Sequence, residues 1–207
     1  MSYIPSLTLP ASVFANPAIS ILLPVGLGLA QGLLSQPGRN TPKSTTDAPN
    51  SDRHTFSKND TVKSKYASLK QPPLRPPPWI FAPVWTALYA LMGYAAHRAW
   101  TTGMASLNPR VVEDTRRGAT LYTVQLAVNQ MFMPLFFGLG RPVEALGVVG
   151  VLTGLVGWLG GVWWGVDKTA GWCIAPYFAW CGFATYLTAG TGYLNGWSFE
   201  GKDGKEE

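Results

Sequence analysis

The sequence predicts an all-α membrane protein, a five-transmembrane-helix bundle with a long disordered loop between helices 1 and 2. Three observations support this fold class. Charged residues make up only 13% of the 207 residues and are clustered. They leave five long charge-free windows, and the apolar side chains in these windows do not alternate. The windows without Asp, Glu, Lys or Arg are 1–38, 76–97, 118–140, 145–166 and 169–199.

Each window is long enough for one transmembrane helix, which needs about 20 residues. Only helices or closed barrels satisfy their backbone hydrogen bonds in lipid. Barrel strands would alternate apolar and polar residues, and these windows are continuously apolar. We therefore expect helices near 17–36, 79–101, 117–138, 143–165 and 171–194.

The segments outside the predicted helices differ in composition. Residues 1–16 form an uncharged tail that lacks the basic start of a signal peptide, since no Lys or Arg precedes Arg39. Residues 37–65 are rich in Ser, Thr, Asn, Asp, Lys and Pro, and such a segment buries too little apolar surface to fold alone. We expect a disordered cytosolic loop there. Residues 66–197 would hold the other four helices and 198–207 a polar C-terminal tail.

Basic residues are distributed unevenly between the two sides of a five-span topology. The loops after the first and third helices and the C-terminus carry 11 Lys and Arg, and the opposite side carries 5. The positive-inside rule places the first group, and with it the C-terminus, in the cytosol. The net charge of +5 is thus explained by topology. A nucleic-acid partner is not expected, because no folded basic surface with interleaved aromatics is visible.

Few residues suggest catalysis or metal binding. Cys173 and Cys181 lie in the fifth predicted helix, about 12 Å apart along its axis, which is too far for a disulfide. His54 and His97 lack the spacing of metal ligands. There is no Ser-His-Asp arrangement, phosphate-binding glycine loop or paired carboxylate inside a span. Conventional hydrolysis and phosphoryl transfer are therefore not expected.

The third predicted helix carries a stripe of aromatic and amide side chains at spacings of 3 and 4 residues, which places them on one helical face. The stripe consists of Tyr122, Gln125, Asn129, Phe132 and Phe136. Amides are costly in hydrocarbon unless they face protein, water or a ligand. Two interpretations stay open at this point: hydrogen bonds that join helices, or the wall of a pocket.

Two more helices carry aromatic stripes. Trp85, Tyr89 and Met92 share a face of the second helix, and Tyr177, Trp180, Ala184 and Leu187 share a face of the fifth. Aromatic residues near span ends, such as Trp79, are typical of the membrane interface. Trp85 and Trp180 lie deeper. Three inward stripes indicate one apolar aromatic cavity for a flat hydrophobic ligand.

The fourth predicted helix has a glycine seam. Its members are Gly147, Gly150, Gly154, Gly157, Gly161 and Gly165. Glycine lets helix backbones approach closely, so the seam predicts a packing face. We favour packing within the bundle, and a homodimer formed through the seam is the alternative.

Several motifs together resemble the TspO/MBR family. They include Pro76-Pro77 and Trp79, Pro83-Val84-Trp85, Leu88-Tyr89, Leu121-Tyr122, Gln125-Leu126, Asn129, Phe136-Phe137-Gly138, Pro176-Tyr177, Ala179-Trp180 and Phe183-Ala184-Thr185. They span residues 66–187, most of the membrane part. Two positions depart from relatives that dimerise through helix three, where small residues become Thr120 and Val124. A basic residue shortly after Tyr193, part of a short cholesterol pattern, is also missing.

The resemblance implies a receptor or translocator that holds porphyrin, heme or another planar apolar ligand such as a sterol, with no covalent cofactor. Ligand-binding residues would be Trp85, Tyr89, Asn129, Phe132, Phe136, Trp180 and Ala184. The loop after helix one would cover the pocket. Two alternatives remain: light-dependent porphyrin degradation, in which Trp85 and Trp180 would be catalytic, and a membrane scaffold with an incidental pocket. The resemblance also suggests the mitochondrial outer membrane.

Overall fold

The structure, a computed structural model, describes residues 3–34, 69–139 and 141–197. The predicted loop 37–65, the tail 198–207 and the end of the first predicted span lie outside the described residues. Five long helices form the described part of the chain: α2 (Pro17–Leu34), α4 (Pro78–Met104), α5 (Pro109–Met133), α6 (Pro142–Val166) and α7 (Lys168–Leu194). Shorter elements are η1 (Pro5–Leu7), α1 (Ala11–Ala15) and the π-helical turn η2 (Pro134–Gly138).

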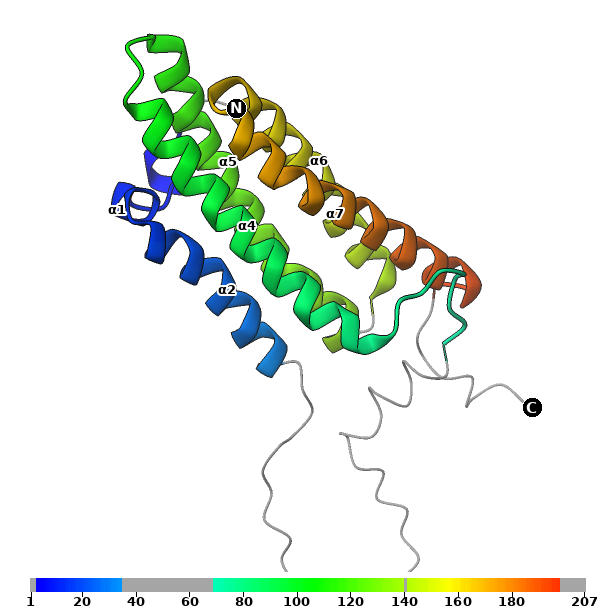
Figure 1. Cartoon of the computed structure of the whole chain (residues 1–207). Helices are drawn as coiled ribbons and strands as arrows, with labels where there is room; N and C mark the ends of the chain where they lie inside the picture. The colour runs from blue at the N-terminus through cyan, green and yellow to red at the C-terminus, as the bar shows by residue number, and fades with distance from the viewer. Residues whose placement is uncertain (1–2, 35–68, 140, 198–207) are drawn as a thin grey trace, which may run out of the picture.

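The long helices lie side by side in one elongated bundle (Figure 1), and α4 contacts α2, α5 and α7. No strand occurs in the ranges that the structure describes. The predicted all-α fold with five long helices is therefore confirmed. Small side chains on α4, namely Ala95, Ala96 and Ala99, are fully buried and let its neighbours approach closely.

Only two of the described helices are long and apolar enough to be taken as membrane spans from composition alone, Trp79–Met104 and Pro142–Val166. The helix α5 is not one of them, because its charge-free part from residue 118 to Met133 is short and contains the amides Gln125, Asn129 and Gln130. It begins eight residues before the predicted start at 117, and this first part is charged. Arg117 pairs there with Glu113 and Asp114 at 3.5 and 3.3 Å. These charges extend α5 beyond the apolar window that begins at residue 118.

Two side chains of α2 donate hydrogen bonds to backbone carbonyls of other helices. Pro134 has no N–H to donate to the carbonyl of Gln130, one turn earlier. The Gln31 side chain of α2 donates to that carbonyl instead, at 2.8 Å. Near the other end of α2, the Ser20 hydroxyl donates to the Gly93 carbonyl of α4 at 2.8 Å. These two hydrogen bonds attach α2 to the rest of the bundle.

The N-terminal tail packs against the bundle, which the sequence did not predict. Phe14 is 1% exposed and stacks on Trp100, with ring centroids 5.2 Å apart. The Thr120 hydroxyl of α5 accepts a hydrogen bond from the Ile4 N–H at 3.2 Å and lies 2.7 Å from the Thr8 hydroxyl. The described part of the tail therefore covers the α5 face around Thr120.

The glycine seam faces outward, so our preferred interpretation of packing within the bundle is wrong for most of it. A Cβ added at any of five seam positions would meet no atom within 4 Å: Gly147, Gly150, Gly154, Gly161 and Gly165. Only Gly157 faces a neighbour, the Phe178 ring of α7. The apolar face that α6 buries is a different one, formed by Val149, Leu152, Val156, Leu159 and Trp163. Glycine spacing identifies a face that permits close approach but does not say what approaches it.

Candidate functional site: an aromatic cluster between α4, α5 and α7

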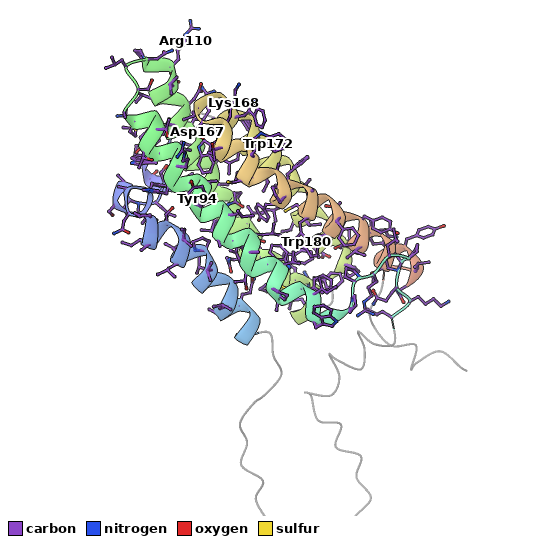
Figure 2. The ribbon with its side chains drawn as sticks, in the orientation of Figure 1. Tyr94, Arg110, Asp167, Lys168, Trp172 and Trp180 are labelled. Atoms are coloured by element: carbon purple, nitrogen blue, oxygen red, sulfur yellow. The ribbon has the colours of Figure 1, made fainter. Side chains whose placement is uncertain are left out.

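Trp85 is the centre of an aromatic cluster between α4 and α7. On α4, Trp85 and Tyr89 are one turn apart, with ring centroids at 5.4 Å. Across the interface with α7, the Trp85 ring meets Tyr177 at 6.2 Å and Trp180 at 6.4 Å, both edge to face. Edge-to-face contact at such distances is favourable for aromatic rings. The two tryptophans from separate helices thus point toward each other, as the aromatic stripes predicted. Trp180 is labelled on α7 in Figure 2.

A buried polar pair adjoins the cluster. The Asn129 side chain of α5 donates to the Tyr89 hydroxyl at 2.7 Å, and the two residues are 3% and 5% exposed. The Tyr89 ring also packs on α2, because Gly28 has no side chain and a Cβ there would collide with the ring. The Tyr89 hydroxyl is therefore fixed by the Asn129 amide, and its ring packs against the backbone of α2 at Gly28.

Gln125 joins helices, which decides between the two interpretations for this amide. Its Nε2 donates to the Met92 sulfur of α4 at 3.0 Å, and its Oε1 accepts from the Tyr177 hydroxyl of α7 at 3.3 Å. All of Gln125 is buried. The Gln125 amide connects α4, α5 and α7. Asn129, on the same stripe, joins α5 only to α4, through a Tyr89 ring that also contacts Trp85.

The three remaining predicted residues lie on the same helical faces, nearer the end where α4 begins. Phe132 follows Asn129 by one turn and stacks on Phe136, with centroids at 5.6 Å. The turn that carries Phe136 is the π-helix η2. Ala184 follows Trp180 by one turn on α7 and is partly buried. Trp85, Tyr89, Asn129 and Trp180 form one contact network, and Phe132, Phe136 and Ala184 lie further along α5, η2 and α7.

Sequence reasoning missed three aromatic residues. Phe81, one turn before Trp85, meets Trp180 at 5.9 Å. On α7, Phe183 meets Trp180 at 5.6 Å and Tyr186 at 6.2 Å. The spacing of Phe81 to Trp85 (four residues) and of Trp180 to Phe183 and Tyr186 (three each) was a signal that could have found them. The cluster therefore continues along α7 toward its C-terminal end.

The segment before α4, residues 69–77, is here called the strap. It runs from the end of α7 to the start of α4 (Figure 1). Pro72 is buried, and the Pro73 carbonyl accepts a hydrogen bond from the Tyr186 hydroxyl at 3.1 Å. The strap is the described part of the loop that we expected to cover the pocket.

The opposite end of the bundle is closed by an ion pair. Arg98 of α4 donates to the Asp167 carboxylate at 3.0 Å, and Thr102 donates to the same oxygen at 3.2 Å. Asp167 also caps α7 by accepting from the Ala170 N–H at 3.0 Å. Burial alone would raise the pKa of Asp167, but hydrogen bonds from Ala170, Arg98 and Thr102 outweigh it and hold the pKa below its ordinary value. Figure 2 shows Asp167 far from Trp180.

The cluster is uncharged and mostly apolar. From the start of α4 to His97 the helix carries no Asp, Glu, Lys or Arg. Among the described residues, no group of three or more His, Cys, Asp or Glu side chains could hold a metal ion. The rings and the Tyr89–Asn129 pair offer flat apolar contact with one polar point.

The five-helix bundle, with two helices apolar enough to cross a membrane and an uncharged aromatic cluster between helices, indicates a helical membrane protein. Comparison with known proteins gives the family. The TspO/MBR family model matches residues 51–194. The chain belongs to the TspO/MBR family, whose members are multi-span membrane proteins, so the predicted membrane bundle is confirmed.

Relatives from fungi, animals and bacteria are similar over 59% to 64% of the chain. A translocator protein homolog of Schizosaccharomyces pombe is 45% identical over 134 residues, 64% of this chain and 79% of the relative. The human translocator protein is 34% identical over 122 residues, 59% of this chain and 69% of the relative. A tryptophan-rich sensory protein of Cereibacter sphaeroides is 36% identical over 122 residues, 59% and 71% of the two chains.

Proposed function

We propose that this protein binds a planar apolar ligand, a tetrapyrrole such as porphyrin or heme or a similar molecule such as a sterol, against the aromatic cluster between α4, α5 and α7. The observation that carries the proposal is the meeting of Trp85 and Trp180 from separate helices at 6.4 Å, beside the buried Tyr89–Asn129 hydrogen bond. Flat apolar rings supply large contact area, and a few polar groups orient the ligand.

The ends of the bundle suggest how a tetrapyrrole would lie. Its propionates are anionic and need water or cations, whereas the cluster carries no charge. The strap end carries Lys70, Arg75 and, at the start of α6, Arg141. A porphyrin would therefore place its apolar edge toward Tyr89 and its propionates toward the strap end.

Binding is tested by titrating the purified protein with protoporphyrin IX, with heme and with cholesterol, using tryptophan fluorescence quenching. Saturable quenching by a tetrapyrrole supports the proposal. Absence of saturable binding by any porphyrin or sterol would favour the alternative that the bundle is a scaffold.

A second candidate function is light-dependent porphyrin degradation. It is favoured by the placement of two indoles, Trp85 and Trp180, where both would contact a bound macrocycle. Oxidative opening of the ring consumes dioxygen, so illuminated samples are compared in air and under argon. Loss of porphyrin absorbance in air by wild type, but not by Trp85→Phe or Trp180→Phe, would make the protein an enzyme. Intact porphyrin in wild type leaves it a binding protein.

The cellular setting is part of the proposal. We infer that the C-terminus is in the cytosol, which the distribution of basic residues supports. The mitochondrial outer membrane is the location that the resemblance to the TspO/MBR family suggests. The outward glycine seam of α6 would pair with a second copy as a homodimer. The bilayer and the ligand are the other partners.

A further inference from the structure

We propose that Asn195 is a latch that holds the strap onto the end of α7 and sets the rate at which ligand enters and leaves the aromatic cluster. The proposal rests on the binding function proposed above and assigns a positioning role to a residue that contacts no ligand. Its basis is a set of contacts between residues 70–73 and the last turns of α7.

Asn195 binds both backbone groups of one strap residue. Its Oδ1 accepts from the Lys70 N–H at 3.0 Å, and its Nδ2 donates to the Lys70 carbonyl at 2.8 Å. Nδ2 also donates to the Thr191 carbonyl at 2.7 Å, which fixes the side chain against α7. A primary amide is the group that supplies this acceptor and donor together. An aspartate at this position would keep the first bond and lose the others.

Three more contacts fasten the strap to α7. The Tyr186 hydroxyl donates to the Pro73 carbonyl at 3.1 Å, and the Thr191 hydroxyl lies 3.4 Å from the Gln71 Oε1. Pro72 packs on Gly190, where an added Cβ would come 2.7 Å from the Pro72 Cβ. Glycine is therefore required at 190 for the strap to lie this close to the helix.

The strap backbone is strained between its two attachments. Leu74 has φ 69°, the left-handed region that costs a non-glycine residue about 1–2 kcal/mol, and its side chain is 82% exposed. The side chain of Leu74 therefore contributes little contact energy to offset the strain. The attachments on α7 have to hold this conformation.

The anchored strap is connected to the ligand-binding rings on both sides. On α7, ring contacts run from Trp180 to Phe183 and from Phe183 to Tyr186, whose hydroxyl holds the strap. On the other side the strap continues directly into α4, whose first turns carry Phe81 and Trp85. The strap thus ties together the ends of the two helices that bear the tryptophans (Figure 1).

This arrangement predicts a kinetic effect. A strap that opens whether or not ligand is present affects entry and exit equally, so weakening the latch accelerates both and leaves the dissociation constant nearly unchanged. Removal of the Asn195 hydrogen bonds should raise both rates by about tenfold. A merely structural role would instead weaken affinity and lower thermal stability.

The test uses two unrelated ways to detach the strap, each with a matched control. Asn195→Ala removes the latch, and Tyr193→Ala changes a residue on the same turn that is 78% exposed. Gly190→Ala pushes Pro72 away and also favours the helix. Gly182→Ala, on the same helix, adds a methyl where no atom lies within 4 Å. Stopped-flow quenching with protoporphyrin IX measures both rates in the full-length protein.

Faster association and release in Asn195→Ala and Gly190→Ala, with both controls like wild type, is the expected result. Unchanged rates in either strap variant, or a loss of affinity without faster exchange, would overturn the latch. Hydrogen exchange at the Lys70 amide tests the anchor without any ligand, so failure of the latch can be told apart from failure of the binding proposal. If wild type binds no porphyrin, the gating role fails together with the binding function. Loss of Lys70 protection in Asn195→Ala would still show that Asn195 anchors the strap.

Discussion

The structure gives Gln125 and Asn129 different partners, which the sequence pattern could not predict. Both amides lie on one α5 stripe, and spacing alone could not separate a helix-joining role from a pocket role. The structure gives Gln125 partners on two helices, Met92 and Tyr177, and gives Asn129 the Tyr89 hydroxyl beside the tryptophans. The difference depends on neighbours that come from α4 and α7, which no local pattern encodes.

Asp167 gives a pH-dependent prediction at this scale. Its pKa is lowered in the folded protein, so its stabilising effect is present above the ordinary carboxyl pKa of about 3.9. The effect is lost as pH falls through the lower, folded value. Wild type should unfold at a higher temperature than Asp167→Asn in detergent at pH 7, and this difference in unfolding temperature should become smaller as the pH is lowered to about 3. The variant Glu144→Gln, at an exposed Glu144–Arg141 pair 3.7 Å apart, is the control. An equal gap between wild type and Asp167→Asn at every pH would contradict the prediction.

At the scale of elements, the charge-free windows predicted the long helices but not the charged residues by which α5 extends beyond its window. The five charge-free windows predicted five long helices because a span in lipid excludes charge, and α6 differs from its predicted range of 143–165 by one residue at each end. The start of α5 was missed because charged residues there extend outside the apolar window. The docking of the N-terminal tail was missed because its partners are distant in sequence: Thr120, for example, lies 116 residues after Ile4.

The crossing of α2 and α4 at Gly93 gives an element-scale prediction. A Cβ at Gly93 would collide with the Ser20 carbonyl and lie 2.6 Å from the Ile21 Cα, and both atoms belong to the backbone. Gly93→Ala should therefore destabilise the protein by about 1–3 kcal/mol. Gly26→Ala on α2, where no atom lies within 4 Å, should not. Thermal unfolding of the two variants measures the difference, and equal midpoints would show that the helices separate without cost.

At the scale of the whole molecule, the two ends of the bundle differ in construction. One end is closed by the Arg98–Asp167 pair and by the N-terminal tail on α5. The other end carries the strap, which attaches through a few hydrogen bonds to α7. The aromatic cluster lies between them. Ligand exchange is therefore expected at the strap end.

The outward glycine seam gives a prediction about assembly. If the seam joins two copies, Gly154→Leu should separate them and raise the dimer dissociation constant about tenfold or more. Gly182→Leu, on an open position of α7, should have no effect. Energy transfer between labelled copies in lipid vesicles measures the association. A monomeric wild type, or a dimer unaffected by Gly154→Leu, would leave the seam facing lipid.

The central claim is that Trp85 and Trp180 from separate helices form one ligand-binding wall. The most direct measurement is the dissociation constant for protoporphyrin IX, by absorbance titration, of wild type, Trp85→Leu, Trp180→Leu and Trp172→Leu. Trp172 is the control, because it lies on α7 and is 65% exposed. We expect affinity to fall about tenfold or more in the first two variants and to stay unchanged in the third. Equal affinity in all four proteins would contradict the account.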